Sequence, residues 1–139
     1  MEIAQMCLYD NICNEVCQVS GIRFAAIINK NGRKVSGGLR NNITPLEHDV
    51  QKIEMLFMEL TLDLLMRKKF DNSFGNIHAI VSYRDKTTII TIPYQDDLIL
   101  LSVEPEVDPS RAIQIVHQKI ADRNIKDEGY QSKSLTHTA

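Results

Sequence analysis

The sequence predicts an α/β sandwich of the α+β type, with the element order helix-β-β-helix-β-β-β-helix. Helical spacing of apolar residues alternates with strand-like apolar runs in this order along the 139 residues. Asn31-Gly32 separates the first two strand-like runs, and this dipeptide is a strong signal for a β-hairpin. A long middle helix then separates these two strands from three further strands.

The first helix is predicted over residues 2–19. Its apolar residues recur at steps of three and four, which is the spacing of one helical face. The face consists of Ile3, Met6, Cys7, Cys13, Val16 and Cys17. Ser20-Gly21 follows, and glycine suits the left-handed backbone conformation that ends many helices.

The next segment predicts a β-hairpin. Residues 22–29 form a dense β-type run, and residues 33–37 form the return strand. Lys30-Asn31-Gly32 makes the turn between them, because asparagine and glycine both tolerate positive φ. The return strand is expected to end at Gly37-Gly38.

The middle helix has a clear predicted start. Thr44-Pro45-Leu46-Glu47 has the pattern of a capping box, in which Thr44 binds the backbone N–H of Glu47 and the Glu47 carboxylate reaches back. Pro45 fits the first helical position, where no N–H is needed. The helix is predicted to run to about Phe70, a length of roughly 38 Å at 1.5 Å per residue.

Three strands are predicted after this helix. Alternating residues predict a strand that starts near Asn76, with Ile77 and Ala79 on one of its faces. Residues 87–92 and 98–103 predict the other two strands. The last run is apolar throughout, which indicates a central strand.

Asp108-Pro109 predicts the start of the last helix, because an N-cap residue precedes a first-turn proline. One face of this helix carries Ala112, Ile113, Val116 and Ile120. The stretch that follows is polar and has too few large apolar residues to offset its ordering entropy. We therefore expect one folded domain over residues 1–125 and a disordered polar tail over residues 126–139.

The charge balance excludes some classes of partner. Sixteen Lys and Arg residues face 18 Asp and Glu residues, so the net charge is −2 and no strong basic field exists to bind nucleic acid. No apolar run approaches the ~20 residues that span a bilayer, and the N-terminus lacks the pattern of a signal peptide. We expect no membrane insertion and a cytoplasmic location, where the three cysteines are reduced thiols.

The order of elements, with an Asn-Gly hairpin before Gly37-Gly38 and a long middle helix, resembles the roadblock/LC7 fold, a profilin-like α/β layout. Residues 21–33 and 67–75 also resemble segments of a family of small archaeal proteins from ammonia oxidisers, whose function is not established. The roadblock resemblance covers about residues 2–124 and implies a five-stranded antiparallel sheet of order 2-1-5-4-3. It also implies a non-catalytic homodimer that acts as a scaffold or regulator of a small Ras-like GTPase or binds a complex subunit.

The middle helix carries two apolar stripes, whereas a helix on one sheet needs a single stripe about 100° wide. The stripe expected to face the sheet consists of Ile53, Leu56, Phe57, Leu60 and Leu64. The second stripe, to one side of it, consists of Met55, Met58, Leu62, Leu65 and Met66.

Burial of each of these five side chains is worth about 1.5–3 kcal/mol, so we expect the same helix of a second chain to cover them. Ile77 and Ala79 complete the predicted dimer interface, on a strand that continues the sheet across the dimer. The alternative is a helix that is buried deeply within its own domain.

The cysteines do not have the spacing of a metal or redox site. On one helix, Cys7 points about 80° away from Cys17 and lies about 15 Å from it along the axis. Structural zinc needs four convergent ligands. We expect Cys7, Cys13 and Cys17 to pack as small apolar groups, with no metal and no cofactor; a site shared by two chains is the alternative.

No motif indicates catalysis. Glu47-His48-Asp49 has residue types suited to acid–base chemistry, but acids in a first helical turn complement the helix dipole. His78 and His117 have no partner in a known motif, and the glycines from Gly32 to Gly38 lack the context of a phosphate loop. We expect no enzymatic activity.

Charged residues of the middle helix outside the second stripe form the candidate partner-binding surface. They are Glu54, Glu59, Asp63, Arg67 and Lys68. A mixed-charge surface suits a transient, electrostatically steered encounter. A second hypothesis is a small-ligand-binding sensor domain of PAS-like layout, which the aliphatic core and the few convergent polar residues disfavour.

Overall fold

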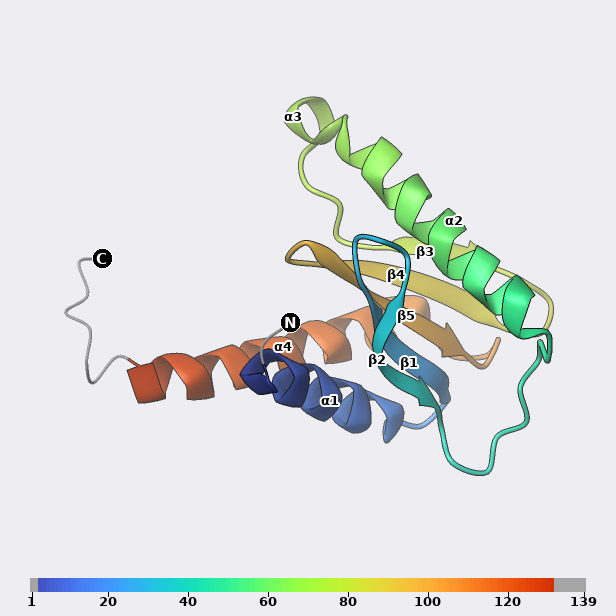
Figure 1. The fold of residues 1–139 in the computed structure, drawn as a ribbon, viewed down its shortest axis with the longest axis horizontal. Helices are drawn as coiled ribbons and strands as arrows, with labels where there is room; N and C mark the ends of the chain where they lie inside the picture. Colours follow the sequence, from blue (N-terminus) through green and yellow to red (C-terminus); the bar gives the residue numbers. More distant parts are fainter. Residues whose placement is uncertain (1–2, 132–139) are drawn as a thin grey trace.

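One five-stranded antiparallel sheet lies between two layers of helices (Figure 1). The computed structural model describes residues 3–131 of the chain, and the side chains of residues 3–123. In chain order the elements are α1 (Ile3–Cys17), β1 (Ile22–Ile28), β2 (Lys34–Leu39), α2 (Val50–Lys68), α3 (Asp71–Phe74), β3 (Ile80–Tyr83), β4 (Thr88–Tyr94), β5 (Asp97–Val103) and α4 (Pro109–Gln131).

The strand order is β2-β1-β5-β4-β3, with every neighbouring pair antiparallel. This order confirms the predicted fold class. Strand β5 lies at the centre, where Leu101 pairs with Ala25 of β1 on one side and with Ile90 of β4 on the other. The prediction that the apolar run at residues 98–103 forms a central strand is therefore confirmed.

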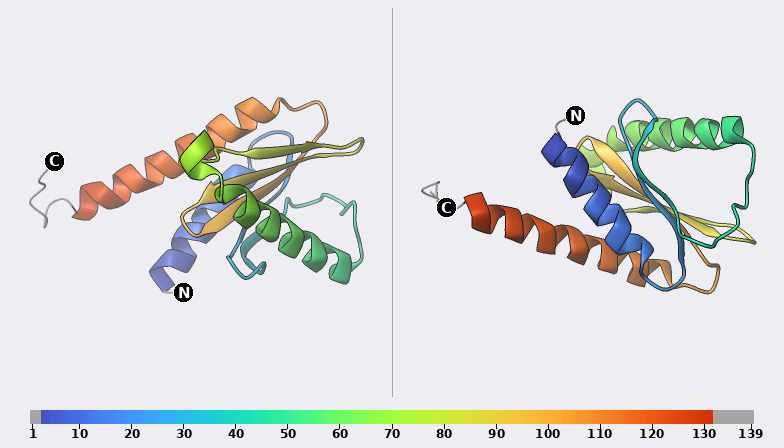
Figure 2. Two further views of the ribbon diagram at one scale, coloured as in Figure 1. Left: turned by 90° about the horizontal axis from the view of Figure 1, so that it is seen from above. Right: turned by 60° about the horizontal axis from the view of Figure 1, so that its bottom comes forward.

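The alternation of side chains along each strand divides the core into two parts. Ile99, Leu101 and Val103 of β5 belong to a cluster of fifteen buried residues that also includes residues of α1 and α4. Leu98 and Leu100 point to the other face and join a cluster of six buried residues that includes Phe57 and Leu64 of α2. Figure 2 shows the same division, with α1 and α4 on one side of the sheet and α2 on the other.

The predicted capping box at Thr44 is wrong. Helix α2 begins at Val50, and the Asp49 carboxylate accepts a hydrogen bond from the backbone N–H of Gln51 at 2.9 Å. Arg23 on β1 donates to the carbonyl oxygen of Thr44 at 2.9 Å, which holds this segment in a connection rather than a helix. Glu47-His48-Asp49 consequently precedes the helix, and aspartate is the stronger cap of the two candidates.

Helix α4 starts as predicted but extends further than expected. The carboxylate of Asp108 accepts from the backbone N–H of Ser110 at 3.0 Å, which confirms the N-cap. The helix then continues through residues 126–131, which the sequence assigned to the polar tail. The remainder of that predicted tail, residues 132–139, lies outside the described residues.

Two other predicted boundaries need correction. Strand β3 begins at Ile80 rather than near Asn76, because pairing with β4 starts only at Ile80 opposite Thr91 and residues 76–79 form a connection after α3. On α1, Ile3 and Met6 are exposed, and the buried residues are Tyr9, Ile12, Cys13 and Val16. The prediction that the N-terminal half of this face is buried is therefore wrong, because that part of α1 extends beyond the core.

The hairpin between β1 and β2 forms at the predicted turn, but β2 extends to Leu39 rather than ending at Gly37-Gly38, because both glycines pair with β1 in the ladder. The backbone N–H of Gly32 donates to the carbonyl oxygen of Asn29 at 2.9 Å, and the Asn29 side chain accepts from Asn31 and Arg33. Of the turn residues, only Gly32 has positive φ, at 78°. A Cβ atom on Gly32 would lie 3.1 Å from the Cα atom of Met58, so the turn contacts the backbone of α2.

We expect Gly32→Ala to lower the free energy of unfolding by about 1–2 kcal/mol through the left-handed backbone alone. The clash with Met58 adds to this loss. Gly38→Ala is the matched control, because Gly38 has ordinary φ and only the flexible Lys34 ammonium nearby. Urea denaturation of both variants measures the difference, and equal losses would contradict the contact between the turn and α2.

Candidate protein-interaction face

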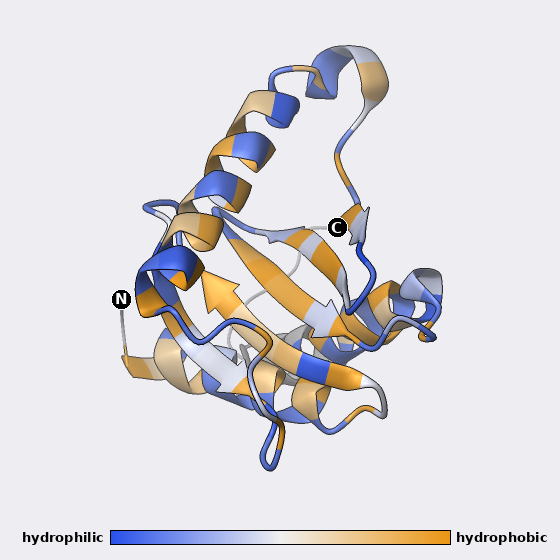
Figure 3. Cartoon of the chain, turned by 90° about the vertical axis from the view of Figure 1, so that its right-hand side faces the viewer, coloured by the Kyte–Doolittle hydropathy of each residue, from blue (hydrophilic) through white to orange (hydrophobic). Residues whose placement is uncertain are grey.

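The surface of α2 that faces away from the sheet is apolar. Its five residues are between 49% and 68% exposed, and we call them the α2 outer face. They are Met55, Met58, Leu62, Leu65 and Met66. Figure 3 shows α2 crossing the sheet with apolar and polar residues interspersed along it. These are the residues of the second predicted stripe, and each stays about half-exposed or more, although the β1–β2 turn lies against Met58.

The first predicted stripe packs on the sheet. Phe57 and Leu64 are buried, and Ile53, Leu56 and Leu60 are half-buried. At 100° per residue, the centre of the outer face lies roughly 175° from the centre of this stripe. The second stripe is therefore opposite the sheet, not to one side of the first stripe as predicted. Thr61, also buried, donates its hydroxyl to the carbonyl oxygen of Phe57 at 2.8 Å, which satisfies its polar group.

The two remaining residues of the predicted interface lie elsewhere. Ile77 and Ala79 are half-buried in the connection before β3 and pack against the two core clusters. Strand β3 is an edge strand of the described sheet, and its last residue, Tyr83, is 74% exposed. The structure thus leaves the edge of β3 accessible but does not place Ile77 and Ala79 on the outer face.

Charged residues flank the outer face. Arg67 donates from Nε to both carboxylate oxygens of Asp63 at 3.0 Å, an ion pair one helical turn apart. Glu54 and Glu59 are exposed, and Lys68 is half-buried. The predicted partner-binding residues are therefore on one helix, and one opposite-charge pair among them is already formed.

An exposed aromatic pair lies where α2 is followed by α3. Phe70 is 57% exposed and Phe74 is 84% exposed, and their ring centroids are 6.0 Å apart in a stacked arrangement. Sequence reasoning treated Phe70 as the end of a helix and missed Phe74. The available signal was a large apolar residue in the otherwise polar segment from Asp71 to Gly75.

An apolar groove of about 400 Å³ lies between the N-terminal half of α2, the connection before it and the sheet. Its apolar lining includes Phe24, Leu46, Val50, Ile53, Phe57 and Leu100. Three of the polar residues that line it bond to other protein groups. Thr87 contacts the hydroxyl of Ser102 at 2.6 Å, and Arg23 donates to Glu104 at 2.8 Å. The groove is therefore suited to an apolar occupant.

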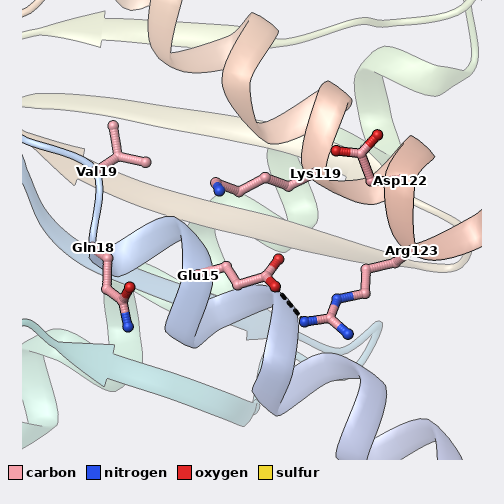
Figure 4. A pocket seen from close by; sticks show the side chains of 6 residues that line it. All are labelled: Glu15, Gln18, Val19, Lys119, Asp122 and Arg123. Atoms are coloured by element: carbon pink, nitrogen blue, oxygen red, sulfur yellow. Dashed lines mark hydrogen bonds and ion pairs between the residues drawn. The ribbon is translucent and has the colours of Figure 1, made fainter.

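A second hollow, of about 420 Å³, separates α1 from α4 (Figure 4). Its side chains include Glu15 and Lys119, and an ion pair between Glu15 and Arg123 crosses it. Asp122 adds a further carboxylate beside Lys119. Opposite charges are balanced within this hollow, so its evident role is to hold α1 against α4.

The cysteines occupy three different environments. Cys7 is exposed, Cys17 is half-buried, and Cys13 is buried between α1 and the sheet. Burial raises the pKa of the Cys13 thiol from its ordinary value of 9.0 to about 11, which keeps it neutral. The Cys17 thiol contacts the carbonyl oxygen of Gly38 at 3.6 Å. Packing as apolar groups thus describes Cys13 and Cys17, whereas Cys7 does not pack in the core.

The histidines considered as candidates for catalysis lie far apart in the chain and in different elements. Exposed His48, His78 and His117 lie on three separate segments, before α2, before β3 and on α4. Among the described residues, no three His, Cys, Asp or Glu side chains are grouped in a way that could hold a metal ion. None of the helices in the described part of the chain combines the length and apolar composition needed to cross a bilayer.

Helices on both faces of a sheet of order 2-1-5-4-3 give this chain the roadblock/LC7 fold. A structure described as MglB with a tetrameric arrangement superimposes with a TM-score of 0.68 at 12% identity, covering 88% of this chain and 89% of that one. Myxococcus xanthus MglB gives 0.65 at 11% identity, with 100% and 98% covered. A roadblock/LC7 domain from Streptomyces avermitilis gives 0.62 at 10% identity, with 85% and 94% covered.

The chain belongs to DUF6659, a family of unknown function, whose model matches residues 1–130. No curated protein matches the sequence. At 10–12% identity, the three structures establish the fold and leave the function to be argued from the surface of this chain.

We expect Cys13→Ala to lower the free energy of unfolding by about 1–2 kcal/mol, because it removes a buried apolar group. The wild-type protein should also lose stability as pH rises from 9 toward 11, because the unfolded thiol releases its proton in this range and the folded one keeps it. Denaturation curves at pH 7 and pH 10 measure both effects. A variant with the same pH dependence as the wild type would contradict this role for Cys13.

Proposed function

We propose that this protein is a non-catalytic, homodimeric scaffold or regulator that binds a Ras-like GTPase or a subunit of a larger complex. The observation that carries the proposal is the α2 outer face, where five large apolar side chains are half-exposed or more on the side away from the sheet. Because about half of each side chain is already covered, burying the remainder would contribute roughly 1–2 kcal/mol per side chain. A contiguous apolar face of this kind marks an interaction site on a monomer.

A second copy of the chain is the proposed cover. Two identical faces can pair about a twofold axis, which is the commonest symmetry of soluble oligomers. The edge of β3 offers backbone groups for further pairing beside the helices. The MglB structure in a tetrameric arrangement supports assembly as a property compatible with this fold.

The partner is proposed from the charges around this face. Glu54, Glu59, Asp63, Arg67 and Lys68 give α2 a mixed-charge surface. Exposed charges of both signs steer encounters and give salt-sensitive association. The roadblock resemblance implies that the encountered protein is a Ras-like GTPase.

We expect Leu62→Glu to convert the dimer to a monomer, because it places an unpaired charge in the paired outer faces. Light scattering with size-exclusion chromatography measures the mass. Met58→Glu should have the same effect, since its side chain belongs to the same face.

Gln114→Glu is the matched control for these variants. It adds the same charge at an exposed position of α4, on the other side of the sheet, and should leave the dimer intact. A Leu62→Glu protein that is folded by circular dichroism and keeps the dimer mass would refute the α2 interface.

We expect a Ras-like GTPase from the same organism to bind the dimer more tightly at 50 mM than at 500 mM salt. The charge reversals Glu59→Lys and Glu54→Lys should weaken this binding without changing the dimer mass. Titration calorimetry with the GTPase loaded with GDP or a GTP analogue tests both points. Salt-insensitive binding, or no binding in either nucleotide state, would contradict the steered-partner proposal.

The groove beneath α2 favours the second hypothesis, a small-ligand sensor, because its volume is that of a ligand pocket. A sensor also needs polar groups that orient its ligand. Thr87, Ser102 and Arg23 already bond to protein atoms, and these bonds would have to be exchanged for bonds to the ligand. The scaffold is therefore the function that the described surface supports best.

A further inference from the structure

Positive charge is concentrated in one segment of the chain. Residues 16–46 contain five of the 16 Lys and Arg residues and none of the 18 Asp and Glu residues. Outside this segment, acidic residues outnumber basic ones. The segment includes both strands of the β1–β2 hairpin and the connection that follows them. The hairpin is therefore a basic region on an otherwise acidic chain.

Two of these five cations are occupied by bonds within the protein. Arg23 forms an ion pair with Glu104 at 2.8 Å and also donates to the carbonyl oxygen of Thr44. Arg40 donates to the carbonyl oxygen of Val19 at 3.1 Å, just after the end of α1. These two arginines hold the base of the hairpin against the rest of the domain, so a partner cannot use them without breaking bonds.

The other three cations lie together at the turn of the hairpin. Lys30, Arg33 and Lys34 are exposed, and with the described residues their side chains form no ion pair or hydrogen bond. We call these three residues the basic turn. The Asn29 side chain accepts from the backbone N–H groups of Asn31 and Arg33, which orders the turn. A partner that binds there does not have to order a flexible loop.

The basic turn lies at the border of the α2 outer face (Figure 1). A Cβ atom on Gly32 would lie 3.1 Å from the Cα atom of Met58, whose side chain is 51% exposed. Thr61 is buried on the same side of α2, between Met58 and the sheet. The turn therefore reaches around one side of α2 and brings its cations next to the interaction face.

The charges of α2 itself do not balance this border. At 100° per residue, Glu54 lies on the same side of the helix as Met58, whereas Glu59 and Asp63 lie on the other side of the outer face. Three cations of the turn thus accompany a single carboxylate of α2. The border between the turn and the outer face is positive, although the chain as a whole is negative.

We propose that the basic turn binds an acidic surface segment of the regulated partner protein. This inference rests on the proposed regulator function and adds the chemistry of the partner's contact surface. Charge complementarity argues for this occupant, because unpaired cations attract carboxylates and repel basic surfaces. A membrane of anionic lipids is disfavoured, because the carboxylates of α2 would approach the same negative surface.

Zero-length cross-linking tests where the partner's carboxylates lie. A carbodiimide couples a lysine to a carboxylate only when the two groups are in contact. With the Ras-like GTPase of the same organism as the probe, we expect mass spectrometry to map links to Lys30 and Lys34. Lys86 between β3 and β4 and Lys119 on α4 are internal controls and should stay unlinked. Links that avoid the turn in a complex that forms would overturn the inference and leave GTPase binding standing.

Charge reversal tests the same contact through affinity. Lys30→Glu/Arg33→Glu should raise the Kd for the GTPase about tenfold at low salt and much less at high salt, because salt screens exposed charges. Arg84→Glu/Arg111→Glu is the matched control, since it makes the same change in charge at exposed positions after β3 and on α4. Titration calorimetry measures both constants. A folded turn variant with the wild-type Kd, or equal losses in the two variants, would overturn the inference.

Three further outcomes separate this inference from the proposed function. A wild-type protein that binds no GTPase in either nucleotide state would overturn both. Carbodiimide links from the basic turn to a second copy, formed without the GTPase, would assign the turn to the dimer and overturn the inference alone. Sedimentation with phosphatidylglycerol vesicles that Lys30→Glu/Arg33→Glu abolishes would assign the turn to a membrane, which would also overturn it.

Discussion

Burial of the central strands on both faces is the constraint on which the rest of the structure depends. Four consecutive residues of β1, Ala25 to Ile28, are buried, and so are the four residues of β5 from Leu98 to Leu101. Side chains of a strand alternate between faces, so such runs require cover on both sides. Helices α1 and α4 cover one face, and the chain must send α2 across the other. The surface of α2 opposite the sheet then becomes the outside of the molecule, and its apolar composition is not needed for the fold.

Local signals in the sequence predict much of this architecture. Asn31-Gly32, the apolar run of β5 and the Asp108-Pro109 cap each depend on a few neighbouring residues, and each forms the expected structure. The start of α2 could not be predicted in this way. The pattern at Thr44 is a valid cap locally, but Arg23, 21 residues earlier in the chain, binds its carbonyl group and holds it in a connection. A tertiary hydrogen bond here overrides a local preference.

The candidate interaction face was only partly predictable. Periodicity identifies Met55, Met58, Leu62, Leu65 and Met66 as a set, because residues on one helical face recur every three or four positions. The same periodicity places this set opposite the first stripe, so its position across from the sheet follows from the residue numbers once the first stripe packs on β1 and β5. Ile77 and Ala79 were assigned to a strand that starts later than expected. The stacking of Phe70 on Phe74 and the groove near Val50 arise from three-dimensional arrangement and have no counterpart in the pattern.

The hydrophobic clusters on the two faces of the sheet differ in size. The cluster between the sheet and helices α1 and α4 has fifteen buried residues, and the cluster between the sheet and α2 has six. Local unfolding requires the least free energy where the fewest apolar side chains must be exposed. Opening the layer under α2 would therefore expose fewer buried apolar residues than opening the layer of α1 and α4. Anything that covers the outer face also raises the free energy of this local opening, so association and the rigidity of α2 are thermodynamically linked. Binding at the outer face is therefore expected to slow hydrogen exchange of the α2 backbone amides, even if the shape of the domain does not change.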